Sequence, residues 1–155
     1  MQRKRAVHNW MPVVTWMIVI FAASTDMMSA EHTSRFIGPF LRWLVPDISL
    51  ATIGAVQLLM RKGAHLTEYA VLGALLLRAL GSGGARLAGK YLFGAWGVAV
   101  MWAALDEFHQ AFVASRTGSP VDVMIDAAGA LIGLTIYWLL TRRKVDNPAK
   151  AAEAD

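Results

Sequence analysis

The sequence contains no cysteine and comparatively little charge, and each shortage narrows what the protein can be. Without cysteine, the chain can form no disulfide and carry out no thiol chemistry. Charged residues make up only 17% of the 155 residues, whereas a soluble domain carries about a quarter. Hydrophobic residues make up 56%. This balance argues against a soluble protein and indicates an integral membrane protein with a single domain.

Signatures of two enzyme classes are also missing. Neither Ser115 nor Ser119 stands in the G-x-S-x-G context of a hydrolase nucleophile. No H-E-x-x-H occurs, and no other spacing distinctive of metal ligands is present. We therefore expect neither a metal nor a cofactor. If a metal were bound, its candidate ligands would be His65, His109, Glu107 and Asp122.

Four apolar runs predict transmembrane helices, at about residues 10–30, 63–81, 90–110 and 121–141. Each approaches the roughly 20 residues that span a hydrocarbon core of about 30 Å. The first run follows a basic start, as in a signal peptide, but the charge pattern of the chain favours an uncleaved helix. Residues 142–155 are polar, and we expect a poorly ordered cytoplasmic tail.

The segment between the first two runs predicts one or two short helices. Ser34 can cap a helix with phenylalanine and leucine on one side and arginine on the other. It is too short to span a membrane, and its amphipathic pattern is typical of a helix lying in the interface. Pro46 ends it, and a second short helix then runs through Met60. Alternatively, both are ordinary packing helices beside an all-α bundle of four transmembrane helices.

The basic residues predict the orientation of this bundle. The net charge of +4 is modest, and the basic residues form short clusters between apolar runs, so we expect no nucleic-acid partner. With a cytoplasmic N-terminus and four crossings, only 5 of the 15 lysines and arginines lie outside. These are Arg35, Arg42, Arg61, Lys62 and Arg116. The split obeys the positive-inside rule and predicts that both termini are cytoplasmic.

Acidic residues gather at the outer ends of the predicted spans. Asp106 and Glu107 lie near the end of the third span, and Asp122 and Asp126 open the fourth. Such charges are costly in a membrane unless they are paired or functional. On the second span, Lys62, His65, Tyr69 and Gly73 share one helix face; on the fourth, Asp122, Asp126, Gly129 and Gly133 do. The glycine pair permits a close helix contact.

We therefore expect one shared pocket between the second, third and fourth spans. His65 and Glu107 should approach within about 4–6 Å, the range over which charges strongly affect each other. They are the candidate acid and base, although Glu107 can equally form a structural ion pair with Lys62 or Arg116. His65 can equally be an interhelical hydrogen-bonding residue. The candidate ligand-binding residues are Lys62, Tyr69, Asp106, Gln110, Arg116, Asp122 and Asp126.

Some of these residues also have simpler interpretations. Tyr69 is more typical of an interface anchor than of an acid. Gln110 can orient a water or substrate amide, or satisfy a backbone group. Asp122 is expected mainly to cap the fourth span and hold Arg116.

Two blocks of this sequence resemble the VanZ-like family of small bacterial membrane proteins. The first block contains Lys62, His65 and Tyr69; the second contains Glu107, Gln110, Arg116, Thr117, Gly118, Asp122, Gly129 and Gly133. Together they extend roughly from Arg61 to Tyr137. Two positions depart from the family pattern: Arg61 replaces an acid, and Asp126 replaces an asparagine. Both changes alter the charge of the expected site.

The resemblance implies a multi-pass protein of the bacterial cytoplasmic membrane with a role in the cell envelope, and the family's namesake is associated with teicoplanin resistance. Three hypotheses follow. The protein binds an anionic lipid, a lipid-linked precursor or a glycopeptide-like ligand at its outer face; it is a membrane-embedded enzyme that uses Glu107 and His65 on a lipid-linked substrate; or it is a small transporter. A homo-oligomer is compatible with all three, and a four-helix transporter would need one.

Overall fold

The computed structural model describes residues 2–25, 30–81, 89–112 and 118–146. Within these ranges all regular structure is helical and no strand occurs, which confirms the all-α prediction. The helices are α1 (Gln2–Ala23), α2 (Ala30–Leu44), α3 (Leu50–Gly81), α4 (Gly89–Gln110) and α5 (Pro120–Asp146).

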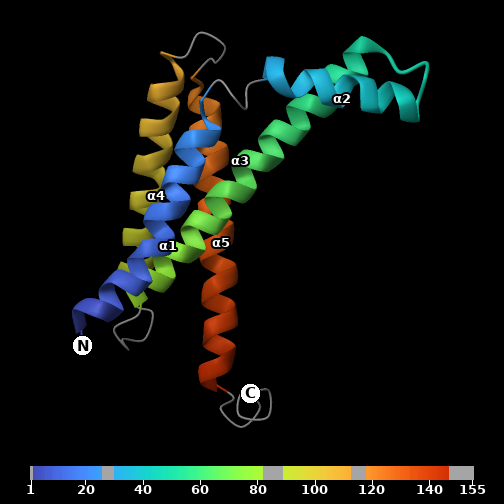
Figure 1. Ribbon diagram of the computed structural model, residues 1–155. Helices are drawn as coiled ribbons and strands as arrows, with labels where there is room; N and C mark the ends of the chain where they lie inside the picture. Colours follow the sequence, from blue (N-terminus) through green and yellow to red (C-terminus); the bar gives the residue numbers. More distant parts are fainter. Residues whose placement is uncertain (1, 26–29, 82–88, 113–117, 147–155) are drawn as a thin grey trace.

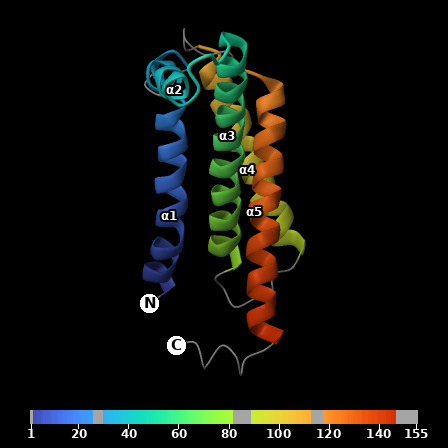
Figure 2. The ribbon, with the colours of Figure 1, turned by 90° about the vertical axis from the view of Figure 1, so that its right-hand side faces the viewer.

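Helix α3 is the centre of the molecule. It contacts α1, α2, α4 and α5, and its contact with α5 is the most extensive of all. Helices α1, α3, α4 and α5 form a bundle, while α2 lies across the direction of the other helices beside the first turns of α3 (Figures 1 and 2). Helix α1 begins and α5 ends at the lower end of the bundle in Figure 1. The opposite end, where α1 and α4 finish and α5 begins, is called the upper end below.

Three glycines allow the closest helix contact. A Cβ atom at Gly129 would collide with the backbone of Leu66, and one at Gly133 with the backbone of Ala70. On the other side of the contact, a Cβ atom at Gly73 would collide with the backbone of Ala130. Helices α3 and α5 therefore touch backbone to backbone, which only small residues permit. The predicted close packing of the glycine pair is confirmed.

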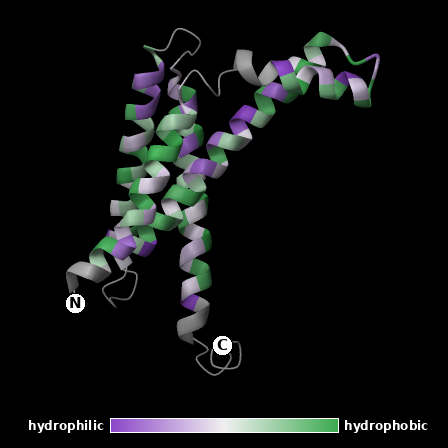
Figure 3. Ribbon diagram, in the orientation of Figure 1, coloured by the Kyte–Doolittle hydropathy of each residue, from purple (hydrophilic) through white to green (hydrophobic). Residues whose placement is uncertain are grey.

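The outer surface of the bundle is strongly apolar. On α1, large exposed side chains recur every three or four residues, including Met11, which is 60% exposed. Phe93 on α4 and Ile136 on α5 are 77% and 53% exposed. Figure 3 shows apolar residues over much of these helices. A soluble monomer seldom exposes so much apolar surface, and lipid is the medium that suits it.

Two helices are long and apolar enough to cross a membrane by composition alone. They are α1, over Ala6–Ala23, and α5, over Pro120–Arg142. Within the part of the chain that the structure describes, α3 and α4 do not meet this criterion. Both carry charged residues within their length, such as Glu68 and Asp106. Four transmembrane helices are therefore not confirmed.

Several boundaries predicted from the sequence are wrong. The predicted break between a short helix ending at Met60 and a span beginning at residue 63 does not exist, since α3 is continuous there. Arginine and lysine are good helix formers, and one glycine costs a helix only about 1 kcal/mol. Helix α1 ends at Ala23 and not near residue 30. Helix α5 continues to Asp146, so the predicted tail starts as helix; residues 147–155 lie outside the described ranges.

Candidate functional site

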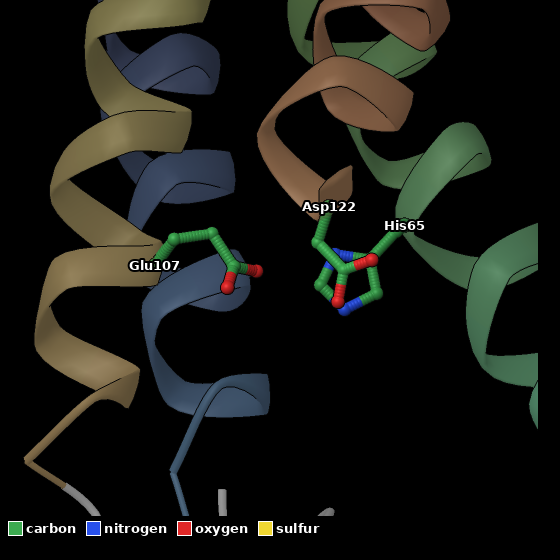
Figure 4. A group of neighbouring side chains, drawn as sticks. All are labelled: His65, Glu107 and Asp122. Atoms are coloured by element: carbon green, nitrogen blue, oxygen red, sulfur yellow. The ribbon is translucent and has the colours of Figure 1, made fainter. Parts of the chain in front are cut away.

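Three helices each bring one ionisable side chain to a common point near the upper end of the bundle. One nitrogen of His65, one carboxylate oxygen of Glu107 and one of Asp122 all lie within 4.8 Å of one another. Figure 4 shows the three side chains converging from α3, α4 and α5. They are 6%, 5% and 3% exposed, respectively. The predicted approach of His65 and Glu107 is confirmed, and we call this group the His65 cluster.

The glycine contact between α3 and α5 sets the position of two members of the cluster. Because Gly129 and Gly133 lie against Leu66 and Ala70, the two helices run side by side in the same direction. Asp126 lies one turn of α5 from Gly129 towards the upper end, and His65 directly precedes Leu66, so their side chains come together. His65 Nδ1 and Asp126 Oδ1 are 3.2 Å apart. The same packing that holds the helices together therefore aligns the acids of α5 with the imidazole of α3.

Asp122 lies between two cations at the edge of the cluster. Its Oδ1 atom forms an ion pair with Lys62, and its Oδ2 atom lies 3.9 Å from Arg61. The side chains of Arg61 and Lys62 are 27% and 29% exposed, whereas that of Asp122 is 4% exposed. We call Arg61 and Lys62 the cationic rim. Two cations share one carboxylate here, so the rim has an excess of positive charge.

The predicted role of Asp122 as a helix cap is wrong. Ser119 precedes α5, and its Oγ atom accepts a hydrogen bond from the backbone N–H of Val121. Ser119 is therefore the cap, while Asp122 lies within the first turn, where a negative charge stabilises the helix dipole. The expected partner Arg116 lies outside the described residues, so neither its pairing nor its role in binding is tested.

Glu107 has one engaged and one unengaged oxygen. Its Oε2 atom accepts a hydrogen bond of 2.8 Å from the backbone N–H of Ser119, which ties the start of α5 to α4. Its Oε1 atom is buried and has no hydrogen-bond partner among the residues described. The alternative of an ion pair with Lys62 is not observed, because Lys62 pairs with Asp122.

A second polar network lies beside the cluster and joins α4 to the end of α1. Ser24 donates a hydrogen bond of 2.6 Å to Asp106 Oδ2. The amide nitrogen of Gln110 donates to the same oxygen and to Ser24 Oγ. Asp106 and Gln110, both predicted as ligand-binding residues, thus bind each other and Ser24. Ser24 was not predicted as a site residue, because its only signal in the sequence is that the first apolar run turns polar there.

Tyr69 and His109 differ from their predicted roles. Tyr69 is 0% exposed, so it is not an interface anchor, and its hydroxyl has no partner among the described residues. His109 stacks on Phe21 with ring centroids 4.5 Å apart and is not a member of the His65 cluster. It was wrongly included among the candidate metal ligands.

Comparison with known proteins adds one finding. The VanZ/LLP1 family model matches residues 6–141. The chain belongs to the VanZ/LLP1 family. The match extends over most of the chain and contains the His65 cluster, the cationic rim and the Ser24 network. Membership makes this VanZ-like chain a cell-envelope membrane protein. No curated protein and no solved structure is significantly similar to it.

In this VanZ-like protein, charge changes sign from the edge of the site to its interior. The cationic rim is partly exposed, one turn of α3 closer to the upper end than His65. Asp106, Glu107 and Asp126 lie deeper and are at most 5% exposed. An anionic group can therefore be attracted at the rim, while donors of the same ligand, or a cation, can contact the carboxylates inside.

Proposed function

We propose that this VanZ-like protein binds a phosphate-bearing envelope lipid or lipid-linked precursor at the outer face of the cytoplasmic membrane. The observation that carries the proposal is the position of the His65 cluster. Buried charge is concentrated inside a bundle whose outer surface is apolar, and it lies directly below a partly exposed cationic rim. Intramembrane charges of this kind normally face the bundle interior or a water-filled cavity, and they often mark the path of a substrate.

The proposal includes four crossings of the membrane. Helices α3 and α4 pack along α5 inside the bundle, and their charged residues lie mostly on buried faces or near helix ends. The large exposed side chains of α4 are apolar, as at Phe93 and Met101, and those of the first half of α3 are too, as at Leu59. A helix that hides its charges among neighbouring helices can span a bilayer even where its overall composition is less apolar.

The rim favours an anionic ligand over a neutral one. Lys62 and Arg61 both contact Asp122, and each can turn to a phosphate oxygen without leaving Asp122 unpaired. Arginine and lysine are the usual phosphate-binding side chains. Binding of a lipid-linked precursor, or of a glycopeptide-like ligand that recognises such a precursor, would connect this site to resistance against teicoplanin.

A membrane-embedded enzyme is the second candidate. It is favoured by the free Oε1 atom of Glu107, which is buried close to His65 and available for proton transfer. The two functions differ in their response to Glu107→Gln. This change keeps the shape of the side chain, so an enzyme would lose turnover, while a binding protein would retain its ligand.

Lipid binding can be tested by native mass spectrometry of the purified protein. We expect co-purifying phospholipid or lipid-linked phosphate, and tighter binding of phosphatidylglycerol than of phosphatidylcholine. Lys62→Ala should weaken phosphatidylglycerol binding at least tenfold. The matched control is Lys90→Ala at the opposite end of the bundle, where the ammonium lies over the Tyr91 ring. Equal loss in both variants, or no preference for the anionic lipid in the unmodified protein, would contradict the proposal.

A further inference from the structure

We propose that His65, Glu107 and Asp122 form a binding site for a divalent metal ion, and that Zn²⁺ is the ion that fits it best. This inference goes beyond lipid binding, because it depends on the donor atoms alone. The three residues come from three helices, so a bound ion would also join α3, α4 and α5 at the upper end of the bundle.

The donor atoms are close enough for one ion. Zinc binds imidazole nitrogen and carboxylate oxygen at about 2.0–2.2 Å, which places neighbouring donors of a tetrahedral site about 3.4 Å apart. In the structure the three donors lie within 4.8 Å of one another. The side chain of Glu107 has three rotatable bonds, and a small rotation closes the remaining gap. Figure 4 shows its carboxylate directed towards Asp122 and His65.

Each of two ligands is oriented by a neighbour, as ligands of metal ions usually are. The Nδ1 atom of His65 lies 3.2 Å from Asp126 Oδ1, so the Nε2 atom remains available to bind an ion. A carboxylate that accepts a hydrogen bond from the second ring nitrogen is a common arrangement around zinc-bound histidine. Glu107 is held through Oε2 by the Ser119 N–H, at 2.8 Å. Both side chains are therefore fixed by contacts that a bound ion would not disturb.

An unpartnered buried oxygen is the second and independent observation. Glu107 is 5% exposed, and its Oε1 atom has no hydrogen-bond partner within the described ranges. The Oδ2 atom of Asp126, which is 0% exposed, has none either. Buried carboxylate oxygens without partners are costly. Lys62 and Arg61 compensate Asp122 at the rim, so a dication in the interior would offset the remaining negative charge.

The donor types select the ion. One imidazole and two carboxylates, without thiolate, suit zinc better than magnesium or calcium, which prefer oxygen ligands alone. Three protein ligands leave a fourth position open. Arg61 and Lys62 lie one turn of α3 away from His65, on the side of the upper end. An open position facing the rim would be accessible to the phosphate of a ligand.

The test uses the full chain, purified in detergent and stripped with a chelator, with Zn²⁺ alone as the probe. Equilibrium dialysis with metal analysis should give one Zn²⁺ per chain. His65→Gln and Glu107→Gln should each weaken binding at least a hundredfold, and Asp126→Asn about tenfold, as for other residues that orient a ligand. His109→Gln and Asp47→Asn, matched changes outside the cluster, should leave binding unchanged.

A second measurement covers the case in which a variant folds poorly. Zn²⁺ should raise the melting temperature of the unmodified protein, because it binds only the folded state. The X-ray absorption spectrum of the bound zinc should show one imidazole nitrogen and several oxygen neighbours. Absence of stoichiometric binding to the unmodified protein, equal loss in His109→Gln, or tighter binding of Mg²⁺ than of Zn²⁺ would overturn the proposal. None of these results would affect lipid binding by the rim, which is measured separately with Lys62→Ala.

Discussion

Asp122 is the residue at which the cationic rim meets the acidic interior. It is 3% exposed, and it pairs with Lys62 and approaches Arg61. Exposed ion pairs contribute less than about 1 kcal/mol, whereas loss of one partner from a fully buried pair costs about 3–5 kcal/mol. The pair with Lys62 lies between these limits, because only one partner is well buried.

We expect Lys62→Met to lower the free energy of unfolding by about 1–2 kcal/mol, since it leaves Asp122 with only its more distant cation. In a double-mutant cycle with Asp122→Asn, the coupling energy should be about 1 kcal/mol, measured by reversible unfolding in mixed detergent. Arg61→Met is the matched control and should cost less, because its guanidinium is 3.9 Å from the carboxylate. A coupling energy of zero would mean that the ion pair is not maintained in the membrane protein.

Ser24 gives a second prediction at this scale. Its hydroxyl is buried directly after the end of α1 and donates to Asp106 at 2.6 Å. Ser24→Ala should lower stability by about 1–3 kcal/mol, because a buried carboxylate loses a donor. The control is Thr135→Val, since the exposed Thr135 hydroxyl donates a hydrogen bond to the Leu131 carbonyl of its own helix. Equal melting temperatures for both variants would show that the network does not hold α1 to α4.

Among the elements, the pair α3 and α5 depends most on small residues. Gly133 lies against the backbone of Ala70, so any side chain there separates the helices. Gly133→Leu should therefore destabilise the bundle by more than about 3 kcal/mol and disturb the alignment of Asp126 with His65. Gly97→Leu on α4 is the matched control, since nothing lies within 4 Å of its Cβ position. If the Gly133→Leu variant had an unchanged melting temperature, the face of α5 that contains Gly133 would not pack against α3.

Helix faces could be predicted from the sequence more reliably than helix ends. The spacing of Gly129 and Gly133 predicted a close contact, because a four-residue period places both on one side whatever the rest of the chain does. The continuity of α3 past Met60 could not be predicted in the same way. Charged residues were interpreted there as the boundary of a membrane span, yet Arg61 and Lys62 remain helical and turn towards Asp122.

The same distinction applies to the site. The approach of His65 to Glu107 could be predicted, because an isolated charge is costly in an apolar bundle and the sequence shows which apolar runs carry charged residues. Ser24 reaches Asp106 across 82 positions, and no local pattern reports such a contact. The burial of Tyr69 was missed for a related reason. Its own helix face was predicted correctly, but only the packing of neighbouring helices decides that the face is interior.

For the molecule as a whole, the decisive prediction is its orientation in the membrane. Helix α1 begins and α5 ends at the same end of the bundle (Figure 1), which is compatible with an even number of crossings. Among the described basic residues, Arg35, Arg42, Arg61 and Lys62 lie on α2 or on the part of α3 nearer the upper end, whereas Arg78, Lys90 and Arg142 lie towards the lower end. The positive-inside rule therefore predicts that the lower end is cytoplasmic and that the site faces outward.

Reporter fusions can test this orientation. Fusions after Lys144, or inserted within residues 81–89, should be fluorescent with a cytoplasmic reporter and inactive with a periplasmic one. A fusion at Ser119 should show the reverse, because it follows a third crossing. The control is a variant with additional lysines beside Ser119, which should weaken or invert the pattern if basic residues determine it. An external C-terminus in the unmodified protein would move the cationic rim to the cytoplasmic leaflet. Lipid binding at the outer face would then be impossible, whereas the zinc site, which depends only on contacts within the bundle, would remain.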